Sequence, residues 1–159
     1  MTDDLDGVAR PQDGDYDGTP DFDLGAYEYN PATADTDGDL MPDRWEHRHG
    51  LDPTNAADAG WHADVDTVVN LHEWIADTDP NDAASYFRIE AINRAAAVRV
   101  WFESSSERNY TLEYTPSPTD TWNGVAGQVN VPGAGGMEDL QDGAGATSRL
   151  YRVQVGLPP

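Results

Sequence analysis

The chain has 159 residues, a formal net charge of −21 at pH 7 and no cysteine. Such an excess of carboxylates excludes nucleic acid as a partner, because phosphate contacts need Lys and Arg. The lack of cysteine excludes disulfides and thiolate metal ligands, and no apolar run approaches the roughly 20 residues of a membrane span.

The negative charge is concentrated in the first half of the chain. Up to Asp82 there are 22 acidic residues against three arginines, a net charge of −19, whereas the remainder has eight acids against six arginines, a net charge of −2. A salt-adapted surface would be acidic throughout. The asymmetry therefore favours local binding of cations.

The first acidic motif is DGDYDGTPD, residues 13–21. Its aspartates alternate, as the ligands of one calcium ion in a loop do, and Gly18 fills the sixth position. Leu24 at the twelfth position supplies no bidentate carboxylate, so a calcium site and a solvated Asp-rich turn both remain open. The ligands of such a site would be Asp13, Asp15, Asp17 and Asp21.

The stretch DTDGDLMPDRWE, residues 35–46, fills every ligand position of a twelve-residue calcium loop. Its sixth position, usually glycine, is Leu40, where a left-handed backbone costs about 1 kcal/mol, so the loop either bends differently or binds the ion more weakly. Pro42 and Gly50 predict a short helix between them that projects Glu46 toward the ion. The predicted ligands are Asp35, Asp37, Asp39, the Met41 carbonyl, Asp43 and Glu46.

A second copy of the pattern is HADVDTVVNLHE, residues 62–73. Its first position is His62, which is a poor ligand for a hard cation. We therefore expect another oxygen, from Asp58 or Asp79, to complete the coordination shell. The predicted ligands are Asp64, Asp66, the Val68 carbonyl, Asn70 and Glu73.

The second half of the chain reads as short strands separated by Pro, Gly, Asn and Ser. The predicted strands cover residues 86–92, 96–104, 109–115, 127–131 and 148–155. Alternation predicts two buried faces, one of Val98, Val100 and Phe102 and one of Tyr110, Leu112 and Tyr114. Five such strands predict a small antiparallel β-sandwich. Its aromatic residues either belong to the core or, if exposed, form a flat surface that binds a ligand. The candidates for such a surface are Trp101, Trp122, Tyr86 and Tyr151.

Residues 35–82 resemble the thrombospondin type 3-like calcium repeats of secreted bacterial proteins. The resemblance rests on DTDGDLMPDRWEHRHGLDPTN and DVDTVVNLHEWIADTDPND, each an aspartate loop, a short helix with an aromatic residue, and a GLDP or TDP closure. It covers about a third of the chain and implies Ca²⁺ as the cofactor. Two ions are expected, or three if the first motif, residues 13–21, also binds one. It also implies a compact spacer held together largely by metal.

The opening stretch, DLDGVARPQDGDYDGTPDFDLGAYEYN, is similar to the last coil of secreted right-handed parallel β-helix proteins. Residues 86–155 are similar in pattern to the small β domains that follow such repeats. The expected fold class is therefore mainly β: a β-helix end coil over 1–34, a calcium-binding segment with two short helices over 35–84, and a β-sandwich over 85–159.

No catalytic motif is complete in this sequence. His72 and Glu73 begin a zinc-protease motif, but Ala76 stands where its second histidine belongs, and no nucleophile elbow or phosphate loop is present. We expect a non-catalytic, calcium-stabilised extracellular or cell-surface module of a bacterial or archaeal protein. The alternatives are a carbohydrate- or protein-binding module, or the end of a β-helix polysaccharide-degrading enzyme whose body lies upstream. Self-assembly through strand edges is a further possible partnership.

Overall fold

The structure, a computed structural model, describes residues 3–5, 7, 9–13, 20, 22, 34–143 and 148–159. The chain divides into two compact units, which we call the loop unit (Met1–Trp74 with Pro80–Asp82) and the strand unit (Ile75–Asp79 with Ala83–Pro159). Most of the segment expected to be a β-helix coil lies outside the described residues. That expectation therefore stays a prediction.

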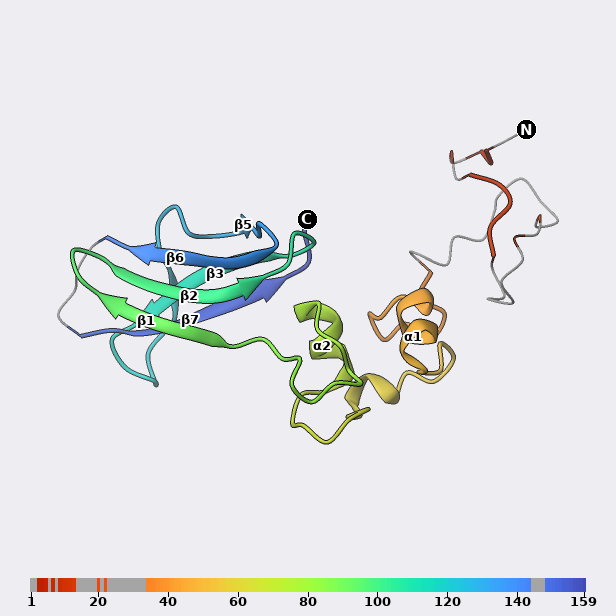
Figure 1. Ribbon diagram of the computed structural model, residues 1–159, viewed down its shortest axis with the longest axis horizontal. Coiled ribbons are helices and arrows are strands. Elements are labelled where there is room, and N and C mark those ends of the chain that lie inside the picture. The colour runs from red at the N-terminus through yellow and green to blue at the C-terminus, as the bar shows by residue number, and fades with distance from the viewer. Residues whose placement is uncertain are drawn as a thin grey trace. The chain divides into compact units, whose positions relative to one another are not determined.

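Two helices of seven residues follow the aspartate-rich loops, as predicted: α1 (Asp43–His49) and α2 (Asn70–Ala76), with the 3₁₀ turn η1 (Asp58–Gly60) between them (Figure 1). Pro42 is the residue before α1, and its extended backbone (φ −72°, ψ 140°) starts the helix. Gly50 ends it in the left-handed conformation with φ 77°, which glycine adopts without strain.

The second half of the chain forms two antiparallel sheets (Figure 1). The three-stranded sheet has the order β1 (Ile89–Arg94), β2 (Val98–Ser104), β6 (Gly136–Asp142). In the four-stranded sheet, β3 (Asn109–Thr115) pairs with β4 (Asn123–Gly124), β5 (Val131–Pro132) and β7 (Leu150–Gly156). The prediction of a mainly β chain is confirmed.

Four of the predicted strands are present, β3 with the predicted ends and the other three with shifted ends, but the one expected over 127–131 is wrong. That segment is mostly turn, and only Val131 belongs to a strand. The strand that sequence reasoning missed is β6, GMEDLQD, whose charged residues hide its period. It forms because β2 presents a free edge, along which Gly136–Asp142 pairs residue for residue. Long-range pairing has overridden local propensity there.

The core of the strand unit lies between the two sheets. Alternate residues of β2 are buried, as are Tyr110 and Leu112 of β3, so the predicted inner faces are confirmed. The rings of Phe102 and Tyr110 lie 4.8 Å apart and join the sheets. Each large apolar side chain buried there contributes about 1.5 to 3 kcal/mol. The strand unit is therefore held by an apolar core.

Candidate metal centre

The first loop winds its backbone around the carboxylate of Asp35. That carboxylate accepts hydrogen bonds from the backbone N–H groups of Gly38 (2.8 Å), Asp39 (3.2 Å) and Leu40 (3.1 Å). Gly38 and Leu40 both have positive φ, 78° and 81°. Leu40 thus adopts the left-handed backbone instead of the different bend that the sequence left open, and it is 68% exposed.

Asp37 and Asp39 each use one oxygen to hold the loop and point the other inward. Oδ1 of Asp37 accepts from the N–H of Asp39 (3.3 Å), and Oδ1 of Asp39 accepts from the N–H of Met41 (2.8 Å). Oδ2 of both residues is buried without a hydrogen-bond partner. These two oxygens are therefore available to a cation.

Helix α1 and the turn η1 add two buried carboxylates. Glu46 is completely buried, and neither of its carboxylate oxygens has a hydrogen-bond partner. Asp58 is 2% exposed; its Oδ2 accepts from the N–H of Asp52 (2.9 Å), whereas its buried Oδ1 has no partner. Oxygens of Asp39, Glu46 and Asp58 lie within 4.8 Å of one another. We call Asp35, Asp37, Asp39, Glu46 and Asp58 the first cluster.

The second loop repeats this arrangement. Oδ1 of Asp64 accepts from the N–H of Asp66 (2.8 Å), and Oδ1 of Asp66 accepts from the N–H of Val68 (2.7 Å). The other oxygen of each aspartate is again buried without a partner. Glu73, fully buried on α2, brings its carboxylate within 4.8 Å of both. We call Asp64, Asp66 and Glu73 the second cluster.

The residues at position nine of the two loops hold backbone and lie outside both clusters. Asp43 accepts from the N–H and the hydroxyl of Thr36, both at 2.7 Å. Asn70 accepts from the N–H of Ala63 (3.1 Å) and donates to the carbonyl of Asp58 (2.9 Å). Their predicted role as ligands stays a prediction, whereas their role in closing the loops is visible in these bonds.

Position seven differs between the loops. Met41 has a fully buried side chain. The Val68 carbonyl accepts a hydrogen bond from Nδ1 of His62 at 2.8 Å, since a carbonyl can only accept. His62 has no clear role in the sequence pattern, but this hydrogen bond links the first and seventh positions of the second loop and stabilises it.

Asp58 is the residue whose place the sequence did not reveal. It was expected, with Asp79 as the alternative, to complete the second loop, but its carboxylate lies in the first cluster with Glu46. It stands outside both twelve-residue patterns, and no spacing rule assigns it to a loop. The only sequence signal is an aspartate after the GLDP closure.

Burial makes the first cluster electrostatically unfavourable by itself. Burial, followed by the nearby carboxylates of Asp39, Asp37 and Asp58, raises the pKa of Glu46 to about 8. Burial is also the main cause that raises the pKa of Asp37 and Asp39. Two charges 4.8 Å apart repel by about 3 kcal/mol at an effective dielectric constant near 20. A bound cation would convert this repulsion into attraction.

The donor set indicates which cation fits. All side chains of both clusters are carboxylates, the ligands that calcium and magnesium prefer, whereas zinc favours the sulfur and nitrogen of Cys and His. Buried carboxylate oxygens without partners are what an oxygen-coordinated ion would satisfy. The clusters therefore fit a hard divalent ion.

The remaining predicted site residues are those of the first motif and two tryptophans of the strand unit. Asp13 is described, whereas Asp15, Asp17 and Asp21 lie outside the described residues, so the first motif stays a prediction. Trp101 and Trp122 are half-buried, and the guanidinium of Arg152 lies 4.5 Å from the centre of the Trp122 ring.

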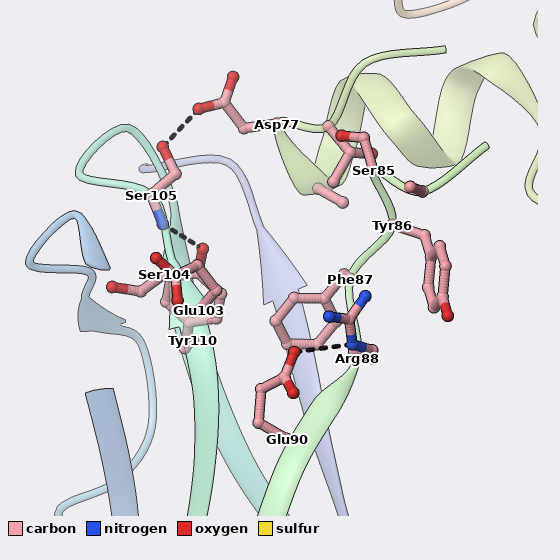
Figure 2. A pocket seen from close by; sticks show the side chains of 13 residues that line it. Asp77, Ser85, Tyr86, Phe87, Arg88, Glu90, Glu103, Ser104, Ser105 and Tyr110 are labelled. Atoms are coloured by element: carbon pink, nitrogen blue, oxygen red, sulfur yellow. Dashed lines mark hydrogen bonds and ion pairs between the residues drawn. The ribbon is translucent and has the colours of Figure 1, made fainter. Parts of the chain in front are cut away.

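The strand unit contains a cavity of about 350 Å³ that sequence reasoning did not locate. Figure 2 shows its lining, where Ser105 donates to Asp77 and Arg88 pairs with Glu90 at 2.7 Å. Tyr86, named above as a candidate platform, lines this cavity and is 42% exposed.

Comparison of the chain with protein-family models, with curated proteins and with solved structures gave no match. Within the described residues, no helix has the length and apolar character needed to cross a membrane.

Proposed function

We propose that residues 35–82 are a calcium-binding segment with one ion at each cluster. The observation that carries this proposal is the convergence of Glu46 and Asp58, two buried carboxylates with unpartnered oxygens, on the aspartates of the first loop. Calcium is preferred over magnesium because it accepts six to eight oxygens in flexible geometry, whereas magnesium demands a near-ideal octahedron and keeps several waters. The resemblance to thrombospondin type 3-like repeats supports the same ion.

The role we propose for this segment is structural and extracellular. Loops of this kind outside cells bind calcium at about 0.1 to 1 mM, a range that extracellular calcium fills and cytosolic calcium does not. Without the ion, the buried carboxylates repel one another, and binding energy then becomes folding energy. The segment would thus be ordered outside the cell as a non-catalytic module beside the strand unit.

The test is a thermal unfolding experiment in chelator and across a calcium titration, with magnesium as the competing ion. A calcium-specific rise in the melting temperature is expected. Glu46→Gln should remove most of this rise, whereas Glu107→Gln, an exposed glutamate of the strand unit, should leave it unchanged. Equal stabilisation by both metals would indicate a non-selective site, and no stabilisation would refute calcium binding.

A second candidate function is binding of a neutral saccharide in the cavity of the strand unit. Two carboxylates of its lining pair with arginines, Glu90 with Arg88 at 2.7 Å and Asp77 with Arg108 at 3.5 Å, and Glu103 adds a third carboxylate. Such a lining suits a hydroxyl-rich neutral ligand better than an anion. The ring of Tyr86, which is 42% exposed and lies 5.0 Å from the guanidinium of Arg88, supplies an aromatic surface on which a sugar ring can pack.

This second function is tested by affinity electrophoresis in gels that contain soluble xylan, mannan or mixed-linkage β-glucan. Retardation in one of them that Tyr86→Ala abolishes and Trp122→Ala preserves is the expected result. Unretarded migration in all three gels, or retardation that survives Tyr86→Ala, would contradict it.

A further inference from the structure

We infer that the two clusters bind calcium with positive coupling, and that Asn70 is the positioning residue that carries the coupling. This inference rests on the proposed function and deepens it. It concerns residues of the loop unit alone: a side chain of the second loop holds the residue that completes the first cluster.

The amide of Asn70 joins the two loops directly. It is fully buried at the start of α2. Its Oδ1 accepts from the N–H of Ala63 in the second loop (3.1 Å), and its Nδ2 donates to the carbonyl of Asp58 (2.9 Å). One rigid planar group therefore relates the closure of the second loop to the position of Asp58.

Asp58 is placed to transmit the occupancy of the first cluster. One of its oxygens lies within 4.8 Å of carboxylate oxygens of Asp39 and Glu46; its Oδ1 is buried without a partner, and its Oδ2 accepts from the N–H of Asp52 at 2.9 Å. Without an ion, the like charges of the first cluster oppose this position, whereas a cation draws the carboxylate inward. The Asp58 carbonyl is then held where Asn70 needs an acceptor, and the second loop closes with less loss of conformational freedom.

A second contact ties the helices that carry the two glutamates. The rings of Trp45 and Trp74 lie 5.7 Å apart with an interplanar angle of 58°. Each tryptophan is the sequence neighbour of a cluster glutamate, Glu46 on α1 and Glu73 on α2. An ion that fixes one helix therefore restricts the other.

The two sites are unequal, which sets the order of filling. The first cluster has five carboxylates, whereas the second has three, and His62 stands at its first position with its ring bonded to the Val68 carbonyl. The first cluster should fill first, and its ion should raise the affinity of the second. Coupling of this kind changes affinities by about 5- to 150-fold, and by reciprocity each ion strengthens the other equally.

The decisive variant is Asn70→Asp. It keeps an oxygen for the N–H of Ala63, as Asp43 does for Thr36 at the matching position of the first loop, but it loses the donor to the Asp58 carbonyl. The added negative charge favours cation binding on electrostatic grounds alone. A loss of coupling would therefore oppose the trend expected from charge.

Calorimetric calcium titration of the full chain is the measurement, with Asn93→Asp of β1 as the control for added charge. The wild type and the control should bind two ions, and the second cluster should fill at a calcium concentration lower, by the coupling factor, than it needs when Glu46→Gln has removed the first site. N70D should still bind two ions, and Glu46→Gln should leave the midpoint of its second cluster unchanged. Independent binding in the wild type would overturn the coupling, and cooperativity retained in N70D would overturn the role of Asn70; neither result would contradict the calcium sites. No calcium binding at all would refute both the coupling and the proposed function.

A second variant keeps the test decisive if N70D does not fold. Glu46→Gln in the otherwise unchanged chain removes the first site, and the calcium midpoint of the second cluster should then rise by the coupling factor. An unchanged midpoint of the second cluster in E46Q would overturn the inference.

Discussion

The replacement Asp58→Asn tests whether the first cluster is a metal site or an acidic loop that hydrogen bonds alone hold in place. In the absence of calcium, the change removes the repulsion of Asp58 with Asp39 and with Glu46. At 4.8 Å and an effective dielectric constant near 20, each pair is worth about 3 kcal/mol when both groups are charged. The variant should therefore melt at a higher temperature than the wild type in chelator, most clearly above pH 8, where Glu46 is ionised.

Calcium should stabilise the wild type more than the variant, which narrows the difference between their melting temperatures. A site with a dissociation constant of about 0.1 mM stabilises the folded state by about 2.7 kcal/mol at about 10 mM calcium. That corresponds to a rise of roughly 10 to 20 °C for a unit of fewer than 100 residues. If the loss of Asp58 weakens binding about 10- to 100-fold, the stabilisation falls to about 0.4 to 1.4 kcal/mol.

The assay is thermal unfolding followed by tryptophan fluorescence in chelator and in calcium, because Trp45, Trp61 and Trp74 report on the loop unit. Asp120→Asn, an exposed aspartate of the strand unit, controls for the loss of one charge. A D58N variant that is less stable in chelator and equally stabilised by calcium would refute the assignment of Asp58 to the ion.

Three further results are expected. Because the pKa of Glu46 is raised from 4.5 to about 8, the metal-free loop unit should lose stability as pH rises from about 4.5 to about 8 and then level off. Calcium binding at pH 7 should release about one proton from this residue, which calorimetry in buffers of different ionisation enthalpy measures; no release would contradict a protonated Glu46 in the metal-free protein. Leu40→Gly should stabilise the calcium-bound loop by about 1 kcal/mol, because φ 81° strains leucine and its side chain is mostly exposed. A melting temperature of the variant below that of the wild type would argue against that strain. Leu112→Ala should destabilise the strand unit by about 2 to 5 kcal/mol in denaturant titrations, equally with and without calcium; a calcium-dependent loss would contradict an apolar core that is independent of the ion.

Local features of this chain were readable from the sequence because they depend on neighbours in the chain. Pro42 and Gly50 bracket α1, and the glycine has the left-handed backbone that ends a helix. The twelve-residue spacing marked Leu40 as the position where glycine usually provides a positive φ, and Leu40 does adopt one. Period-two alternation likewise identified the buried faces of β2 and β3, because successive side chains of a strand point to opposite faces.

The tertiary structure decided the features that depend on residues far apart. Asp58 joins the first cluster and is held by Asn70, twelve positions later, so no local spacing reveals either contact. Both oxygens of Asp43 accept hydrogen bonds from Thr36, a loop-closing role that the spacing did not reveal, and its role as a ligand stays a prediction. Strand β6 exists because β2 offers it an edge. The sequence by itself determined where acidic oxygens are supplied, whereas packing determined which of them converge in buried clusters.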